Sequence, residues 1–172
     1  LLMISAAIYT FGYGMEISSQ RLDIVLLWTN IEYIGICTLA ALWLIFVIQY
    51  SGYERWLTWR NILLLFLIPA IVLISKWTDK FHHLIYLNPF LDTSGTLSLL
   101  SFERGPMHYV MSAYTATVII SGMVLLIINR RNASLLFRQQ TTILILTASM
   151  LLFVFIYYVS DIKFIPALDN LD

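Results

Sequence analysis

The chain has 172 residues, of which 60% are hydrophobic and only 12% are charged, and its mean hydropathy is +0.83. Soluble domains are typically about 45–50% apolar and about 25% charged, so the composition excludes an ordinary soluble domain and favours an integral membrane protein. The formal net charge is zero, with ten Lys and Arg against ten Asp and Glu. This balance gives no reason to expect nucleic acid as a partner.

Apolar runs in the chain are suited to crossing a bilayer core of about 30 Å as helices. In chain order they cover residues 1–15, 24–50, 62–75, 109–128 and 141–160. None alternates as a barrel strand would, so we predict an all-α, polytopic membrane bundle with these five spans. The first run starts without a Met, and an odd number of spans suggests one more on each side. We therefore expect a fragment of a longer protein with seven spans.

The third run contains Pro69, and its flanking Lys76 and Trp77 are expected at the membrane interface. A proline inside a helix removes one backbone hydrogen bond and can kink the helix, so Pro69 could be a hinge. The alternative, which we favour, is a proline that is tolerated because a neighbouring helix satisfies the freed carbonyl.

Charge in the connecting segments predicts the orientation of the bundle. The short segments 51–61 and 129–140 hold five Arg against one Glu. Because short basic loops stay in the cytoplasm, the longest connection, residues 78–106, is predicted to face outward. Its turn residues and aromatic side chains predict an extracytoplasmic lid loop over the helix ends, with β character at 96–102.

Several short segments, taken in order, are similar to a known family. They are Glu-Tyr-Ile-Gly at 32–35, Thr78 followed by His82-His83, and Gly-Pro-Met-His at 105–108. This order resembles the seven-transmembrane N-terminal sensory region of bacterial histidine kinases, which also occurs on some diguanylate cyclases. The resemblance extends from about residue 11 to residue 172 and implies helices two to six of the seven. The family more often has Trp or Phe where this chain has His108, and Asn where it has Asp79.

The resemblance implies a transmembrane sensory domain, residues 1–172, that acts as a receptor in a two-component signal-transduction system. It would detect an external or membrane-borne signal and relay it to a cytoplasmic histidine kinase output domain. The implied location is the bacterial cell (inner or plasma) membrane, with multiple passes through the lipid bilayer and homodimerisation through the output domain. The signal stays open between a small molecule, a peptide and a membrane protein. We predict no catalytic residue, metal or cofactor in this segment, whereas the full-length protein would be a sensor histidine kinase or a diguanylate cyclase.

Two other classes compete with a sensor. A fragment of a membrane transporter or channel predicts inverted internal repeats with interrupted helices at matching positions, and the sequence has no such repeat. A membrane-embedded enzyme would need ionisable groups that converge at one depth, but the fourth and fifth runs contain no charged residue.

Glu32 is the most informative candidate for sensing the signal. It lies about eight residues into the second run, roughly 12 Å below its start, where an ionisable side chain is costly and by default suggests function. It could receive a ligand cation or sense protonation; alternatively, it is a structural hydrogen-bond anchor or an interfacial carboxylate. Trp28, Glu32 and Gly35 share one helical face, and Asn30 and Glu16 are expected in the same outer half.

His82, His83 and His108 are the remaining candidates for signal sensing, and all three fall on the predicted outer side. The simpler interpretation is that they are polar interfacial residues that hold the lid. A metal site is the alternative, because imidazole suits zinc, copper and nickel.

Small residues recur every four positions in the fourth run, at Ala113, Thr117 and Ser121. Small residues at this spacing allow helices to approach closely, so we predict a packing face there, with a polar ligand pocket as the alternative. Gly35 is predicted to leave room for another helix or for a ligand.

Overall fold

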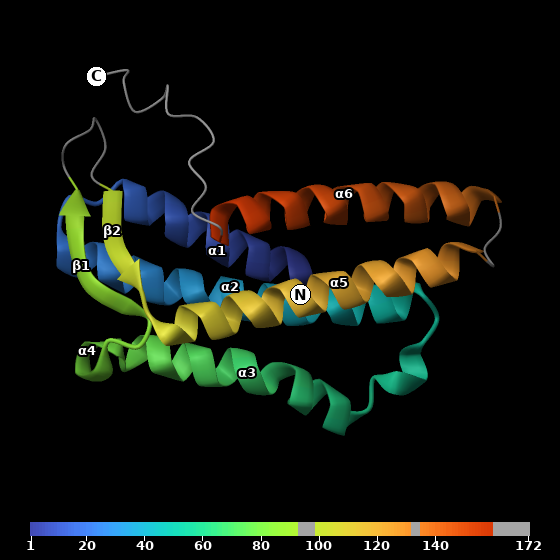
Figure 1. Cartoon of the computed structure of the whole chain (residues 1–172), viewed down its shortest axis with the longest axis horizontal. Helices are drawn as coiled ribbons and strands as arrows, with labels where there is room; N and C mark the ends of the chain where they lie inside the picture. The colour runs from blue at the N-terminus through green and yellow to red at the C-terminus, as the bar shows by residue number, and fades with distance from the viewer. Residues whose placement is uncertain (93–98, 132–134, 160–172) are drawn as a thin grey trace, which may run out of the picture.

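The computed structural model is mostly helical and describes residues 1–92, 99–131 and 135–159 (Figure 1). Its elements, in chain order, are α1 (Leu2–Ile17), α2 (Leu22–Tyr50), η1 (Glu54–Trp56), α3 (Trp59–Trp77), α4 (Asp79–His82), β1 (Tyr86–Asp92), β2 (Leu99–Arg104), α5 (Pro106–Arg131) and α6 (Leu135–Val159).

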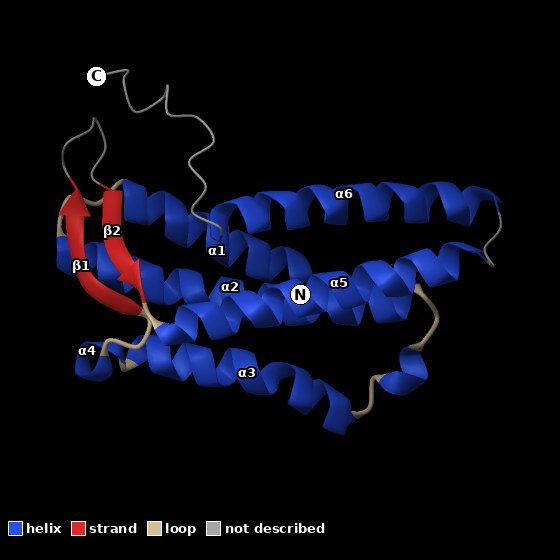
Figure 2. Cartoon of the chain, viewed as in Figure 1, coloured by secondary structure: helices blue, strands red, loops and turns tan. Residues whose placement is uncertain are grey.

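The long helices lie side by side, and a small antiparallel hairpin, β1–β2, lies with α4 at one end of the bundle (Figure 2). We call this end the hairpin end. The opposite end holds η1, the end of α5 and the start of α6, and we call it the loop end. α1 runs along the part of α2 that is nearer the hairpin end (Figure 1). Interactions at the hairpin end can therefore involve α1 as well as α2, α3, α5 and α6.

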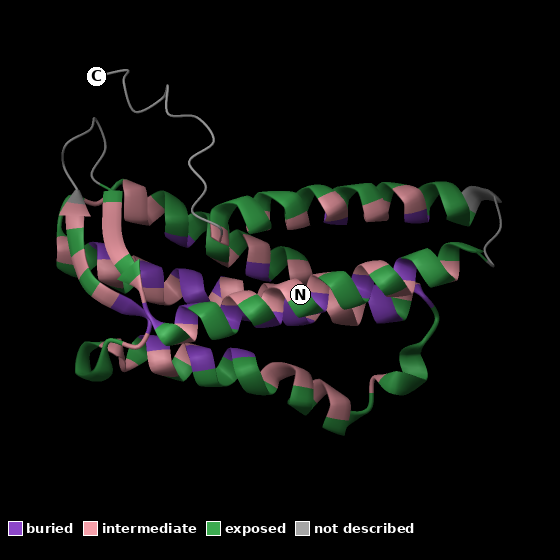
Figure 3. Ribbon diagram, viewed as in Figure 1, coloured by how far each residue is buried: buried purple, intermediate pink, exposed green. Residues whose placement is uncertain are grey.

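Four helices are long and apolar enough to cross a membrane, namely α2, α3, α5 and residues Phe137–Val159 of α6. They support four of the five predicted spans. α1 forms as a helix, but its 16 residues are fewer than the roughly 20 that a crossing needs, so the fifth crossing stays a prediction. Exposed residues follow the outer faces of the long helices (Figure 3). Many of them are large and apolar, for example Leu64 and Ile74 on α3 and Phe153 on α6. Such a surface suits lipid contact.

The segment at 78–106 differs from the predicted all-α architecture, because it holds a helical turn and two paired strands. The strands pair Tyr86 with Arg104 at one end, with an irregularity between Leu87 and Phe90. Pro89 lies in that irregularity and cannot continue a helix, which helps to explain the extended backbone. The predicted β region agrees with β2 over 99–102, whereas its residues 96–98 lie outside the described residues.

Small residues allow α1 and α2 to approach closely. A Cβ added to Gly35 would lie 2.7 Å from the backbone N of Tyr9 and 2.8 Å from the carbonyl O of Ser5. On the facing side, a Cβ added to Gly12 would lie 3.1 Å from the Cα of Glu32. The contact between these two helices is thus backbone against backbone.

The buried core lies between α2, α3, α5 and the start of the hairpin. Its members are mostly apolar or aromatic and come from each of these elements: Tyr33, Cys37, Ala40, Val72, Ile85, Tyr86, Met111, Tyr114 and Val118.

Pro69 lies inside α3 and is buried. It has no N–H to donate to the carbonyl of Leu65, four residues earlier. The hydroxyl of Tyr114 on α5 donates to that same carbonyl at 2.7 Å. The structure therefore supports the interpretation that a neighbouring helix satisfies the carbonyl freed by Pro69.

Replacing Tyr114 with Phe is expected to lower the free energy of unfolding by about 1–2 kcal/mol, because the carbonyl of Leu65 would lose its donor in an apolar setting. Reversible unfolding of the chain in mixed micelles measures this change. Tyr109→Phe is the matched control, since Tyr109 is 53% exposed and the same hydroxyl is lost there. Equal stability of the two variants would contradict the role of Tyr114.

Candidate functional site

Polar side chains are buried inside the hairpin end of the bundle. Glu32 of α2 is 8% exposed and Lys76 of α3 is 4% exposed. The carboxyl of Glu16 on α1, a half-buried residue, adjoins that of Glu32, and the rings of Tyr33 and Tyr86 lie beside Lys76. We call these five residues the buried polar cluster. Ionisable side chains inside a membrane bundle are costly, which makes the cluster a functional-site hypothesis.

Aromatic rings, rather than a carboxylate, hold the ammonium group of Lys76. Its Nζ lies 3.3 Å from the centroid of the Tyr86 ring and 5.1 Å from that of Tyr33. The two rings meet edge to face with centroids 6.1 Å apart. Burial raises the pKa of Tyr86 well above its usual value, so the phenol stays neutral and its ring face attracts the cation. Lys76 is therefore covered by protein side chains and does not reach outward from the bundle. Its position at the membrane interface stays a prediction.

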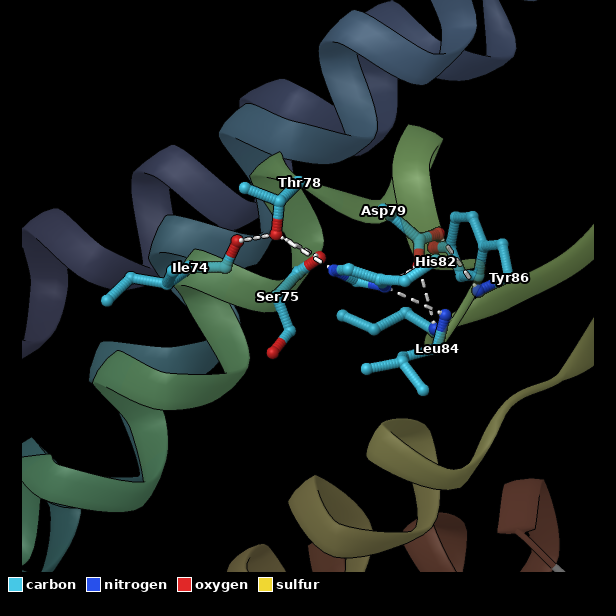
Figure 4. Close-up of polar contacts among 8 residues, drawn as sticks. Ile74, Ser75, Thr78, Asp79, His82, Leu84 and Tyr86 are labelled. Carbon is cyan, nitrogen blue, oxygen red and sulfur yellow. Dashed lines mark hydrogen bonds and ion pairs between the residues drawn. The ribbon is translucent and has the colours of Figure 1, made fainter.

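Asp79, directly after α3, fixes the position of Tyr86. Its Oδ1 accepts a hydrogen bond from the backbone N–H of Ile85 at 2.9 Å, and its Oδ2 accepts one from the N–H of Tyr86 at 3.1 Å (Figure 4). Both carboxylate oxygens are thus engaged by the start of β1. The Tyr86 ring is held over Lys76 as a result.

His82 forms hydrogen bonds within the turn that leads into the hairpin. Its Nδ1 accepts from the backbone N–H of Leu84 at 3.2 Å, and its Nε2 lies 2.9 Å from the Oγ1 of Thr78 (Figure 4). An accepting Nδ1 places the proton of a neutral ring on Nε2, which then donates to Thr78. The Thr78 hydroxyl in turn donates to the carbonyl of Ile74 at 2.8 Å. His82 thereby stabilises α4 against the end of α3.

The other strand of the hairpin is attached to α6. The guanidinium of Arg104 donates to the carbonyl of Tyr158 at 2.8 Å and to that of Val159 at 2.9 Å. Carbonyls in the last turn of a helix lack partners within the helix, and a cation there also complements the helix dipole. The hairpin therefore connects the end of α3, through Asp79, with the end of α6, through Arg104.

A groove lies beside the buried polar cluster. Its larger part has a volume of about 470 Å³ and is lined by Leu22, Asp23, Leu26, Leu27, Asn30 and Lys80. A smaller part, of about 100 Å³, shares Leu26, Asn30 and Lys80 with the larger one and extends to Lys76, Trp77, Asp79, His83, Tyr86 and Pro89. The groove thus reaches from the first turns of α2 to the buried ammonium of Lys76.

A family model for the N-terminal 7TM region of histidine kinase matches residues 1–171. The chain belongs to this family. No curated protein and no solved structure matches the chain at a significant level. As a 7TM histidine kinase region, the chain is a multi-pass membrane segment in signal transduction, and the family describes the sensory part of the kinase, not its catalytic part.

Within this 7TM region, the helical face that carries Trp28, Glu32 and Gly35 is directed at α1. The Trp28 ring meets the Phe11 ring edge to face, with centroids 5.7 Å apart. Gly35 and Glu32 contact α1 as described above. Asn30 lies on a different face and lines the groove. The structure therefore brings Glu16 and Glu32 together and separates Asn30 from them.

The predicted histidines occupy three different surroundings. His82 is bonded within α4, and His83 lines the smaller part of the groove. His108 is buried at the start of α5, where its ring centroid lies 6.4 Å from that of Phe102 and 6.3 Å from that of Tyr158. In the described ranges, no group of three or more His, Cys, Asp or Glu could hold a metal ion. The metal-site alternative therefore gains no support.

Ala113, Thr117 and Ser121 are all exposed on α5. The hydroxyl of Ser121 bonds back to the carbonyl of Thr117 in its own helix. The buried face of α5 instead carries Tyr114 and Gly122, where a Cβ would lie 3.0 Å from the Nε1 of Trp43. These three residues, which we call the small-residue stripe, therefore do not pack against another described helix. Their face of α5 is rotated away from α2 and α3. Packing against a helix outside the described residues stays a prediction.

Several members of the site escaped the sequence analysis, namely Tyr33, Lys76, Lys80, Tyr86 and Arg104. Lysines at the end of a span usually reach for the interface, so Lys76 carried no distinguishing signal. The aromatic residues were too numerous to choose among, with aromatics making up 15% of the chain. Only the tertiary contact between the hairpin and the two helix ends brings these side chains together.

Proposed function

We propose that this 7TM histidine kinase region detects a signal at the hairpin end and relays it to a cytoplasmic histidine kinase domain. The observation that carries the proposal is the burial of two ionisable side chains, Glu32 and Lys76, without an ion pair between them. Burying an ionisable group without an ion-pair partner opposes folding. We infer that these residues are kept for a function rather than for stability.

The hairpin offers a route for the relay. A signal that moves Tyr86 would act on the same hairpin whose Arg104 binds the end of α6. At the loop end, α6 meets α2 through stacked rings of Tyr50 and Phe137, with centroids 5.1 Å apart. Relay requires two packings of these helices that bind the signal with different affinity. Positive charge in the loop-end connections supports a cytoplasmic loop end and an extracytoplasmic hairpin end in the plasma membrane of a bacterium.

Glu32→Gln is expected to change the basal autophosphorylation of the full-length protein in nanodiscs several-fold without lowering its thermal stability. The amide keeps the shape of the side chain, but it cannot ionise, and it changes the contact with the adjoining carboxyl of Glu16. Glu103→Gln is the matched control, because Glu103 is exposed at the same end. We expect this control to leave autophosphorylation unchanged.

The alternative is a fragment of a membrane transporter or channel. If Glu32→Gln and the control gave the same kinase output, the sensing role of Glu32 would be wrong. Flux of solute through vesicles containing the full-length protein, together with a kinase output that no substitution at the hairpin end alters, would favour the transporter.

A further inference from the structure

We propose that the groove beside Lys76 and Lys80 binds a small, freely diffusing amphiphile with one anionic head group, a carboxylate or a phosphate. The proposal rests on the proposed sensor function, since it gives the chemical class of the signal. The two ammonium groups would face the head group, and the apolar wall of α2 would face the tail.

Lys76 is the first argument for an anion. Its side chain is almost fully buried, yet it lines the smaller part of the groove. The carboxyls that act electrostatically on Lys76 are those of Asp79, Glu16 and Glu32. In the part of the chain that the structure describes, none of them lies within ion-pairing distance of Lys76.

Those three acids are already engaged elsewhere. Asp79 accepts two backbone hydrogen bonds, and the carboxyls of Glu16 and Glu32 adjoin each other. Among the described residues, the amino group of Lys76 has no hydrogen-bond acceptor, and the rings of Tyr86 and Tyr33 lie beside it. In a setting of low dielectric constant, an anion placed there would be attracted far more strongly than in water.

The rest of the groove complements an amphiphile. Asn30 and Lys80 line both of its parts, and neither side chain has a hydrogen-bond or ion-pair partner among the described residues. The acid at its far end, Asp23, is paired with Arg21 at 2.8 Å. Lys76, Lys80, Asn30 and His83 are the polar side chains that line the groove beside Asp79, whose oxygens accept backbone N–H groups, and beside the ring of Tyr86. The leucines of α2 form its apolar wall.

The volume favours a small molecule as the occupant. About 470 Å³ in the larger part lies within the range of roughly 300–1,000 Å³ that is typical of small-molecule sites. The leucine wall would remove an apolar tail from water, at a gain of about 25 cal/mol per Å² of buried apolar surface.

The test is a calorimetric titration of decanoate, below its micellar concentration, into the full-length protein in phosphatidylcholine nanodiscs, with empty nanodiscs subtracted. We expect saturable binding that Lys80→Glu weakens at least about tenfold, as loss of a charge-assisted contact predicts. Arg60→Glu, the same charge reversal at an exposed site on the loop end, should leave the affinity unchanged. Lys76→Met should also weaken binding, and Lys80→Glu decides the matter if the Lys76 variant does not fold.

Three outcomes of this titration would overturn the proposal: no saturable binding, equal binding of uncharged decanol, or an affinity unaffected by Lys80→Glu.

Nanodiscs that contain anionic phosphatidylglycerol separate the two sources of an anionic head. If they abolish decanoate binding, a membrane lipid occupies the groove and the free amphiphile is wrong. Binding is measured without a kinase readout. Decanoate that binds as expected but leaves autophosphorylation unchanged would therefore contradict the sensor function and leave the site standing.

Discussion

Gly35→Ala is expected to destabilise the bundle by about 1–3 kcal/mol, the usual cost of overpacking. The new Cβ would lie 2.7 Å from a backbone N of α1 and 2.8 Å from a backbone O. Backbone atoms cannot rotate away as the end of a flexible side chain can, so α1 would have to move as a unit. The free energy of unfolding in mixed micelles measures the change.

Gly14→Ala is the matched control on α1, because a Cβ added there meets nothing within 4 Å. In a helix interior, Ala is favoured over Gly by roughly 0.5–1 kcal/mol. The control is therefore expected to be neutral or slightly stabilising, and the two variants should change stability in opposite directions. If Gly35→Ala were as stable as Gly14→Ala, α1 would not pack against α2 through Gly35.

Arg104→Ala is expected to release the last turn of α6. The variant loses two hydrogen bonds from a charged donor to the carbonyls of Tyr158 and Val159, and each such bond contributes about 1.5–3 kcal/mol. Amide hydrogen exchange at the end of α6 should accelerate by at least about tenfold, because local opening becomes less costly. Mass spectrometry of the protein in nanodiscs resolves this segment.

Glu103→Ala, one residue earlier on the same strand and exposed, controls for disturbance of the hairpin itself. It should leave the exchange of α6 unchanged. In the full-length kinase, Arg104→Ala should also reduce any response to the signal, whereas Glu103→Ala should not. Exchange at the end of α6 that stayed slow in the Arg104 variant would show that the hairpin does not hold α6.

Length and hydropathy were enough to determine the class of the protein. Runs such as 109–128 contain no charged residue, and in lipid only a helix satisfies their backbone locally. The family followed from short segments such as 32–35 and 105–108, and the family match over residues 1–171 confirmed it. Glu32 could be singled out because a charge within an apolar run is conspicuous whatever surrounds it. Its role in sensing stays a prediction.

Tertiary structure alone decided which side chains meet. Lys76 follows an apolar run, and nothing in its neighbourhood along the chain distinguishes it from a lysine at the interface. It is buried because Tyr33, from α2, and Tyr86, from the hairpin, cover it. Likewise, Arg104 binds α6 across 55 positions of the chain. Periodicity along a helix predicts an apolar or a small-residue face, but which face meets a partner depends on how the helices pack. For that reason the stripe at Ala113 points outward, whereas Gly35 lies against α1.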